Sequence, residues 1–321
     1  MSKKPKKIFK PRGTGWLPHK QDYRNANWNK IFGAIASPPP SVFSRLIPDY
    51  IPFQGDELAC VACTAAADQE YGSRLEDHNI KLSFRELYGE TPGGSGGRNY
   101  LDVVKRVKYT GIPEDTFCPN SVELKTSEFL DMAQFRIQPL YNNAAIYRIK
   151  SYSFLTDLSL NSLRTACFRK PIWIAFPGNN ADWSKDKDEI VNFSGKIEWY
   201  HSVLMIDWNN NLYNGILNWW GDRYRKLSIN YPIMAALSTE DLPDNWQSKD
   251  MNYVILPNGE QFLLYEVLRL AFNIADPIEL ADLKAQGLNV EPKPLTELPA
   301  SYIIYPLIKK DRLGDLFGFT K

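Results

Sequence analysis

The sequence predicts a mixed α+β fold with two lobes, one mainly helical and one mainly β, and a cleft between them. Two observations lead to this prediction. Residues 41–150 are dominated by helical patterns, whereas residues 151–232 contain short apolar runs typical of buried strands. A helical half followed by a β half is typical of α+β proteins. With 321 residues, the chain is also long enough to carry extensions at both ends.

The first two segments are an arm and a helical lobe. Residues 1–40 are basic, then aromatic, then proline-rich, which predicts an extended arm that wraps the body. In the lobe, the alanine-rich residues 61–76 predict a helix, and residues 102–107 predict a second helix with Gly111 as its stop. The glycine-rich residues between these helices predict a loop.

The third segment predicts the β lobe. Residues 172–176 and 202–208 are apolar runs of strand length, and residues 212–219 form a third run after a turn of three asparagines at 209–211. The last two runs are therefore expected to pair as a hairpin. The lobe is expected to end near residue 232.

The fourth segment, residues 233–321, is an extension that could serve for docking. Residues 262–275 have apolar side chains at helical spacing and predict a helix, and residues 276–287 predict another, with Pro277 near its start and Gly287 at its end. Residues 302–305 predict a short apolar strand.

Composition excludes several classes of function. The net charge of +1 argues against nucleic acid as a partner of the whole protein. A run of six basic side chains within residues 3–12 comes before the first acid, Asp22. Such a run is usually a solvated arm, the alternative being docking on an acidic surface, a partner protein or nucleic acid. No apolar run approaches the ~18 residues of a membrane span, and no apolar stretch of a secretory signal follows the basic residues. Four cysteines are too few for a disulfide framework, which favours an intracellular protein with free thiols.

The most informative residue is Cys60, which follows Gln54 by six positions and opens the predicted alanine-rich helix. A helix start leaves backbone N–H groups unpaired and carries positive dipole charge. Both favour the thiolate, which is the nucleophilic form of cysteine. The amide of Gln54, on a turn with Gly55, can point to the same place as the Cys60 N–H, and together they can hold an oxyanion.

A cysteine nucleophile needs a base and a residue that orients the base. Of three histidines, His19 lies in the arm and His78 in a polar turn, whereas His201 stands at the mouth of a predicted strand. His201 follows Cys60 by 141 positions, a separation found in papain-type enzymes. Asn218 comes at the end of the partner strand, where antiparallel pairing can bring it beside the imidazole. No residue pattern suggests a metal or a cofactor.

With these residues in order, the chain resembles the papain-like cysteine peptidases, in particular bacterial and phage-type members without a secretory signal. The resemblance rests on Gln54-Gly55, Cys60, His201 and the sequence Asn218-Trp219-Trp220-Gly221. A weaker match is the segment Gly15-Trp16-Leu17-Pro18 followed by Asp22-Tyr23-Arg24. The resemblance covers roughly residues 14–232. It implies a papain-like two-lobed fold in which the β lobe is barrel-like.

The resemblance also implies roles. Cys60 would attack a peptide carbonyl, and His201 would pair with it as imidazolium and protonate the leaving amine. Asn218 would orient the ring, Trp220 would shield that hydrogen bond, and Gln54 would complete the oxyanion hole. The implied activity is that of a thiol endopeptidase that passes through an acyl-enzyme, with a polypeptide as substrate and no cofactor.

The glycine pair Gly96 and Gly97 matches the family residues that bond the backbone of an extended substrate, which approaches closely because glycine lacks a Cβ. Three positions depart from the family. Val61 stands in place of a tryptophan, Glu57 in place of a half-cystine, and Tyr200 in place of a residue that is often acidic or Asn. These departures bear on the specificity of the cleft, and the absent disulfide agrees with an intracellular setting.

Other interpretations are open. Cys63 with Cys60 forms a Cys-x-x-Cys sequence, which is also typical of redox pairs, although no thioredoxin-like βαβ unit surrounds it. The basic arm and the extension are compatible with an assembly component, active or not, of a virion or other large complex, in which both segments bind protein partners. A transglutaminase-like or amidase reaction uses the same Cys–His pair, but such enzymes favour Asp rather than Asn as the orienting residue.

Overall fold

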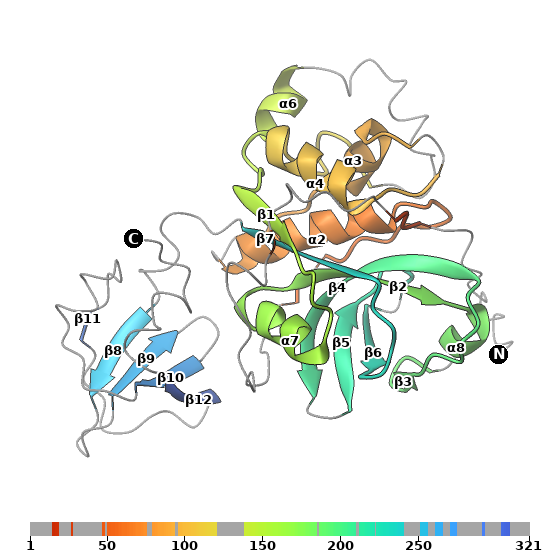
Figure 1. Ribbon diagram of the computed structural model, residues 1–321. Helices are drawn as coiled ribbons and strands as arrows, with labels where there is room; N and C mark the ends of the chain where they lie inside the picture. The colour runs from red at the N-terminus through yellow and green to blue at the C-terminus, as the bar shows by residue number, and fades with distance from the viewer. Residues whose placement is uncertain are drawn as a thin grey trace, which may run out of the picture.

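A computed structural model describes residues 15–18, 27, 47–48, 50–75, 79–93, 96–120, 138–184, 186–209, 212–221 and 223–240, and the backbone of five strands beyond them. Two groups of elements make up the main body (Figure 1). The helical part contains α2 (Cys60–Leu75), α3 (Phe84–Glu90), α4 (Tyr100–Tyr109) and α6 (Gln138–Ala144). The β part contains β1 (Ser151–Phe154), α7 (Leu160–Arg169), β2 (Ile172–Gly178), α8 (Asn180–Trp183), β3 (Ile190–Val191), β4 (Trp199–Asn209), β5 (Tyr213–Leu217), β6 (Tyr224–Ser228) and β7 (Ala235–Glu240).

The β part is built on one seven-stranded sheet with the order β1-β7-β2-β4-β5-β6-β3. All neighbours pair antiparallel except β3 and β6. The hairpin expected from the asparagine turn is present, because β4 pairs with β5 from Leu204↔Leu217 to Asn209↔Tyr213. Figure 1 shows the helices α2, α3, α4 and α6 gathered on one side of this sheet.

The helix α2 lies between the two parts and packs against α3, α4, β2 and β4. It confirms the helix predicted over residues 61–76. Every residue from Cys60 to Gly72 is buried, including Asp68 and Glu70. A helix that is covered on all sides is expected to have small apolar residues all round, which is why this one is rich in alanine. The second predicted helix is α4, and Gly111 follows its C-cap Thr110 with φ 91°, a conformation that favours glycine.

A buried ion pair joins α2 to the sheet. The Asp68 carboxylate lies 3.2 Å from Lys170 Nζ and accepts hydrogen bonds from Trp173 Nε1 (2.9 Å) and Thr239 Oγ1 (2.6 Å). Lys170 also donates to Thr239 Oγ1 at 2.7 Å. The side chains of Asp68 and Lys170 are 0% and 5% exposed, so the pair is shielded from water. Both charges are thus satisfied at the junction between the helical part and strands β2 and β7.

Replacing Asp68 by alanine is expected to lower the free energy of unfolding by about 3–5 kcal/mol, because it leaves the Lys170 charge buried without a partner. Denaturant unfolding followed by circular dichroism measures this loss. The matched control is Lys81→Ala, which breaks the ion pair with Asp115 at a site where Lys81 is 44% exposed; its expected cost is below about 1 kcal/mol. Equal losses in the two variants would contradict the prediction.

The β part continues beyond residue 232, where the sequence suggested a boundary. β7 pairs antiparallel with both β1 and β2 and so occupies an internal position in the sheet. Its sequence, Ala-Ala-Leu-Ser-Thr-Glu, has few of the β-branched and aromatic residues that mark strands. The partner strands on both sides, rather than local preference, hold this segment in the sheet.

A second sheet follows, with five strands in the order β11-β8-β9-β10-β12. Its strands are β8 (Met251–Ile255), β9 (Gln261–Tyr265), β10 (Leu270–Ile274), β11 (Glu291–Pro292) and β12 (Ile303–Ile308). The strand predicted over residues 302–305 is confirmed as β12. The helix predicted over residues 262–275 is wrong, because β9 and β10 pair antiparallel there. The segment is apolar at almost every position, so it fits helical and strand periodicity alike. Pairing with the neighbouring strands therefore selects its conformation. The helix expected at 276–287 lies outside the described residues.

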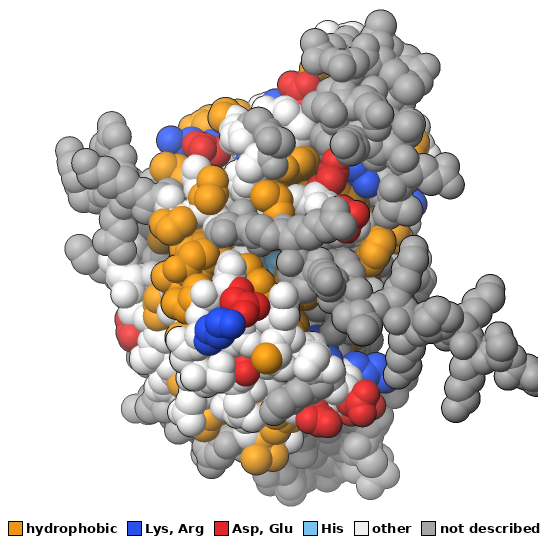
Figure 2. Space-filling view, turned by 90° about the vertical axis from the view of Figure 1, so that its right-hand side faces the viewer, with side chains coloured by type: hydrophobic (Ala, Val, Ile, Leu, Met, Phe, Trp, Pro, Cys, Tyr) orange, Lys and Arg blue, Asp and Glu red, His pale blue; other side chains and the backbone are white. Residues whose placement is uncertain are grey.

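The described surface mixes charges. On the face shown in Figure 2, acidic and basic side chains lie near one another and hydrophobic side chains form the larger coloured areas. In the described part of the chain, no helix combines the length and the hydropathy needed to cross a membrane.

Candidate active site

Cys60 is the first residue of α2, and the first helical hydrogen bond runs from the Cys63 N–H to the Ala59 carbonyl at 2.9 Å. The N–H groups of the first turn therefore have no partner within the helix. Cys60 and Cys63 are both free thiols and both fully buried. The structure confirms the predicted helix start at Cys60 and places Cys63 one turn deeper.

Gln54 precedes Cys60 on a tight turn in which Gly55 has φ 63°, a backbone conformation that glycine adopts without strain. The turn is attached to the β part by a hydrogen bond from the Gln54 N–H to the Trp219 carbonyl at 3.1 Å. The Gln54 side-chain amide donates to the Glu57 carbonyl at 2.8 Å. Gln54 is thus held next to the segment that carries Asn218, with its amide engaged within its own turn in this state.

His201 and Asn218 come together as the sequence suggested. His201 lies in β4, Asn218 follows β5, and pairing of the two strands brings His201 Nε2 to 2.9 Å from Asn218 Oδ1. With the amide oxygen as acceptor, Nε2 carries the proton of the neutral ring and Nδ1 is left as acceptor. Trp220 stacks on the imidazole at a centroid distance of 3.9 Å and an angle of 22°. The hydrogen bond between His201 and Asn218 is therefore shielded from water, and the imidazole is held in one orientation.

Two more tryptophans complete an aromatic wall beside the imidazole. Trp183 and Trp199 each meet Trp220 edge to face, at 5.3 and 5.1 Å, and each lies edge-on to His201 at 6.4 and 6.3 Å. Phe176 stacks on Trp183 at 5.6 Å. This wall buries His201 to 1% exposure.

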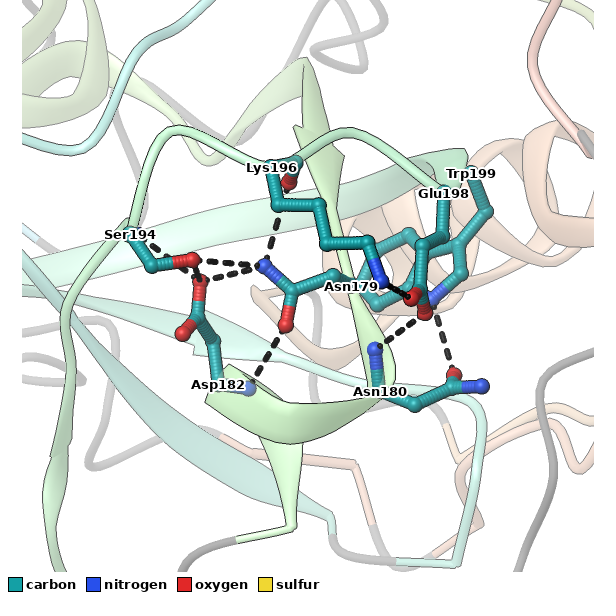
Figure 3. A network of polar contacts seen from close by, with 7 residues as sticks. All are labelled: Asn179, Asn180, Asp182, Ser194, Lys196, Glu198 and Trp199. Carbon is teal, nitrogen blue, oxygen red and sulfur yellow. Dashed lines mark hydrogen bonds and ion pairs between the residues drawn. The ribbon is translucent and has the colours of Figure 1, made fainter.

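A polar network joins helix α8, which carries Trp183, to the start of strand β4, which carries Trp199 (Figure 3). Asn179 caps α8 by accepting from the Asp182 N–H at 2.8 Å, and its amide donates to Ser194 Oγ at 3.0 Å. Asp182 in turn accepts from the Ser194 N–H at 2.9 Å. The indole of Trp199 donates to Asn180 Oδ1 at 3.0 Å. The network therefore fixes α8 and the start of β4 relative to each other, and with them the surroundings of His201.

Comparison with known proteins shows which solved structures share the architecture of this chain. No family model matches the sequence, and no curated protein does either. Among solved structures, xylellain, a cysteine protease from Xylella fastidiosa, aligns over 73% of this chain and 98% of its own with a TM-score of 0.59 and 20% identity. Digestive procathepsin L 3 of Tenebrio molitor aligns over 72% and 76% with a TM-score of 0.56 and 14% identity. The proform of the ragweed protease Amb a 11 aligns over 69% and 71% with a TM-score of 0.53 and 16% identity.

The chain has the papain-like cysteine protease fold. The predicted α+β class and two-lobed architecture are therefore confirmed. Within this papain-like fold, Cys60 opens the long buried helix, and His201 and Asn218 come from the sheet.

A segment of the N-terminal arm lies directly on the cysteine. A Cβ added to Gly15 would lie only 2.5 Å from Cys60 Sγ, so the glycine backbone packs against the sulfur. The arm pairs with Arg98, because the Arg98 N–H donates to the Gly15 carbonyl at 3.0 Å and the Leu17 N–H donates to the Arg98 carbonyl at 2.9 Å. The predicted substrate-binding glycines Gly96 and Gly97 immediately precede Arg98, so the arm lies next to them.

Trp16 anchors this segment. Its indole lies edge to face with Tyr100 of the helical lobe at 6.1 Å and with Tyr200 of the β lobe at 5.9 Å, and it is 3% exposed. The anchor therefore contacts both sides of the papain-like fold. Leu17, the next residue, is 39% exposed and contributes little to the docking.

Burial determines the charge state of the site. Burial raises the pKa of the Cys60 thiol to about 12, against smaller opposing effects of the backbone N–H groups of Ser202 and Val61. Burial lowers the pKa of His201 to about 3, although the hydrogen bond to Asn218 acts in the opposite direction. The covered site therefore holds a neutral thiol and a neutral imidazole. The expected thiolate–imidazolium pair requires access of water.

Sequence reasoning missed two groups of residues here. The aromatic wall brings in Trp183 and Trp199, which have no characteristic spacing to His201. The Gly15–Trp16 contact was also missed, although Gly15-Trp16-Leu17-Pro18 was noted as a weak match to the family. In the described residues, no group of three or more His, Cys, Asp or Glu side chains is placed to hold a metal ion.

Proposed function

We propose that this chain is a cysteine endopeptidase with Cys60 as nucleophile and His201 as its acid–base partner. The observation that carries the proposal is the buried 2.9 Å bond between His201 Nε2 and Asn218 Oδ1 beneath Trp220, in a papain-like fold whose buried helix opens with Cys60. The bond leaves Nδ1 as the basic nitrogen. Asn218 as the orienting residue favours a peptidase over transglutaminase-like or amidase chemistry.

The reaction would proceed in two steps. In the first, the thiol proton passes to His201 Nδ1, the thiolate sulfur attacks the peptide carbonyl, and His201 returns the proton to the leaving amine, which leaves an acyl-enzyme. In the second, His201 takes a proton from water, the hydroxide displaces the sulfur, and the acid product departs. The oxyanion of each tetrahedral intermediate would be held by the Cys60 N–H and by the amide of Gln54 after it leaves the Glu57 carbonyl. Gly96 and Gly97 would bond the backbone of the polypeptide substrate.

Labelling with an epoxysuccinyl peptide tests this assignment. Intact-mass measurement of the full chain and of a Trp16→Ala variant, which exposes the cleft, is expected to show one adduct, and peptide mapping is expected to place it on Cys60. A Cys63→Ser variant serves as the matched control and should label as fast as its parent. Because the imidazole activates the thiol, His201→Ala is expected to slow labelling at neutral pH by about 100-fold or more. An adduct on Cys63, or equal rates without His201, would refute the proposal.

A further inference from the structure

A line of three buried hydroxyls connects the two lobes directly beneath Cys60. Tyr100 Oη lies 3.0 Å from Ser202 Oγ, Ser202 Oγ lies 2.8 Å from Thr64 Oγ1, and Thr64 Oγ1 donates to the Cys60 carbonyl at 2.8 Å. All three side chains are fully buried. They come from α4, β4 and α2, so the line crosses from the helical lobe to the sheet and back to the helix that carries the nucleophile.

The direction of these hydrogen bonds follows from the number of protons. Each hydroxyl has one proton to donate. Thr64 uses its proton on the Cys60 carbonyl, so Ser202 must donate to Thr64. Tyr100 must then donate to Ser202. Ser202 is therefore the middle member, at which one bond is accepted and one is donated, and no apolar side chain of similar size can replace it.

The backbone of Ser202 is attached to the other members of the candidate site. Its carbonyl accepts from the Trp219 indole at 2.8 Å, and Trp219 is the neighbour of Asn218 in sequence. Its N–H faces the sulfur of Cys60. Ser202 also follows His201 in β4, and because side chains alternate along a strand, the imidazole and the hydroxyl point to opposite faces of the sheet. Ser202 is thus connected to all three candidate residues: to Cys60 through its N–H, to His201 as its neighbour in β4, and to Asn218 through Trp219.

We propose that Ser202, held by Thr64 and Tyr100, is a positioning residue that sets the register between Cys60 on α2 and His201 on β4. This inference rests on the proposed function, since it assigns to Ser202 the alignment of that function's reacting pair. Apolar packing between a helix and a sheet is close-fitting but not directional. Directional hydroxyl bonds fix the position, and loss of one leaves buried polar groups without partners.

The test compares Ser202→Ala with Ser202→Thr, which keeps the hydroxyl. Both substitutions are made in the full chain that carries Trp16→Ala, so that the cleft is open. Ser202→Ala is expected to lower kcat for a peptide substrate by about 10- to 100-fold with KM changed less than about threefold, because misalignment affects the reacting atoms. In the same variant, the rate of Cys60 alkylation by iodoacetamide is expected to rise only at higher pH. Ser202→Thr should restore both. Ser153→Ala, at a buried serine of β1, is the matched control and should change neither.

Thr64→Val provides a second variant, because it removes the bonds of Thr64 to Ser202 and to the Cys60 carbonyl while keeping the side-chain shape. It is expected to lower kcat and shift the alkylation profile as Ser202→Ala does. An unchanged kcat and alkylation profile in either folded variant, even with reduced stability, would overturn the proposal. If neither the Trp16→Ala parent nor any of its variants hydrolyses peptides, the proposed function fails. The alkylation profile still measures the alignment of Cys60 and His201 and decides the role of Ser202.

Discussion

Replacing Cys60 by alanine is expected to abolish peptide hydrolysis, with a loss of at least about 10³-fold in kcat, because no other group in the site can form the acyl-enzyme. The fold should survive. Cys60 is a small buried side chain at the start of a helix, and removal of its sulfur leaves only a small cavity that costs about 1 kcal/mol. Hydrolysis of a mixed peptide library, followed by mass spectrometry, measures the activity, and circular dichroism confirms the fold.

The control for this variant is Cys63→Ala, which removes the other thiol of the same helix. Cys63 is fully buried one turn further along α2, and no role in turnover is expected for it. Turnover that persists in Cys60→Ala but disappears in Cys63→Ala would reverse the assignment. Loss in both variants with intact folds would point to chemistry that needs the pair of thiols, as a redox reaction does.

Replacing Trp16 by alanine is expected to accelerate both Cys60 alkylation and peptide hydrolysis by at least about tenfold in the full chain. Trp16 is 3% exposed and contacts Tyr100 and Tyr200. Truncation of a buried tryptophan costs about 3–5 kcal/mol, and 1.4 kcal/mol is enough for a tenfold change in the open population. Gly15→Ala should act in the same direction, because its Cβ would collide with Cys60 Sγ.

The pH dependence distinguishes release of the arm from general loosening. In the covered site, burial raises the pKa of Cys60 to about 12 and lowers that of His201 to about 3, so the wild-type alkylation rate should climb steadily with pH above neutrality. Entry of water at Cys60 removes the burial effect on its thiol, so the Trp16→Ala profile should reach its plateau at lower pH. Leu17→Ala, at a side chain 39% exposed, is the matched control. Wild-type rates and profile in the Trp16→Ala variant would show that the arm does not restrict access to Cys60.

Much of the candidate site could be predicted because its chemistry depends on short, ordered sequence features. The resemblance to papain-like peptidases, whose nucleophile follows the glutamine by six residues, selected Cys60 over Cys63, and the structure places Cys60 at the first position of α2. The strand–turn–strand pattern around residue 210 implied antiparallel pairing, and pairing brings Asn218 to His201. The first inference used the family resemblance, whereas the second used local geometry, in which a residue's position along a hairpin follows from counting.

Other parts could not be predicted, for two reasons. The segment of β9 and β10 is apolar at almost every position, so its periodicity does not distinguish strand from helix. β7 has weak strand preference and enters the sheet only because β1 and β2 are there to pair with it. In both cases long-range pairing, rather than local preference, selects the conformation.

By itself, the sequence determined the α+β class, the long helix that opens with Cys60, and the candidate residues His201, Asn218 and Gln54. Only the tertiary structure decided that Gly15 lies on the sulfur, that Trp183 and Trp199 enclose the imidazole, and that Ser202 joins Thr64 to Tyr100. The physical reason is that periodicity and motif spacing are short-range properties of the chain. Contacts between residues far apart in sequence depend on how the lobes and the arm pack together, and the same contacts set the burial that keeps Cys60 and His201 neutral.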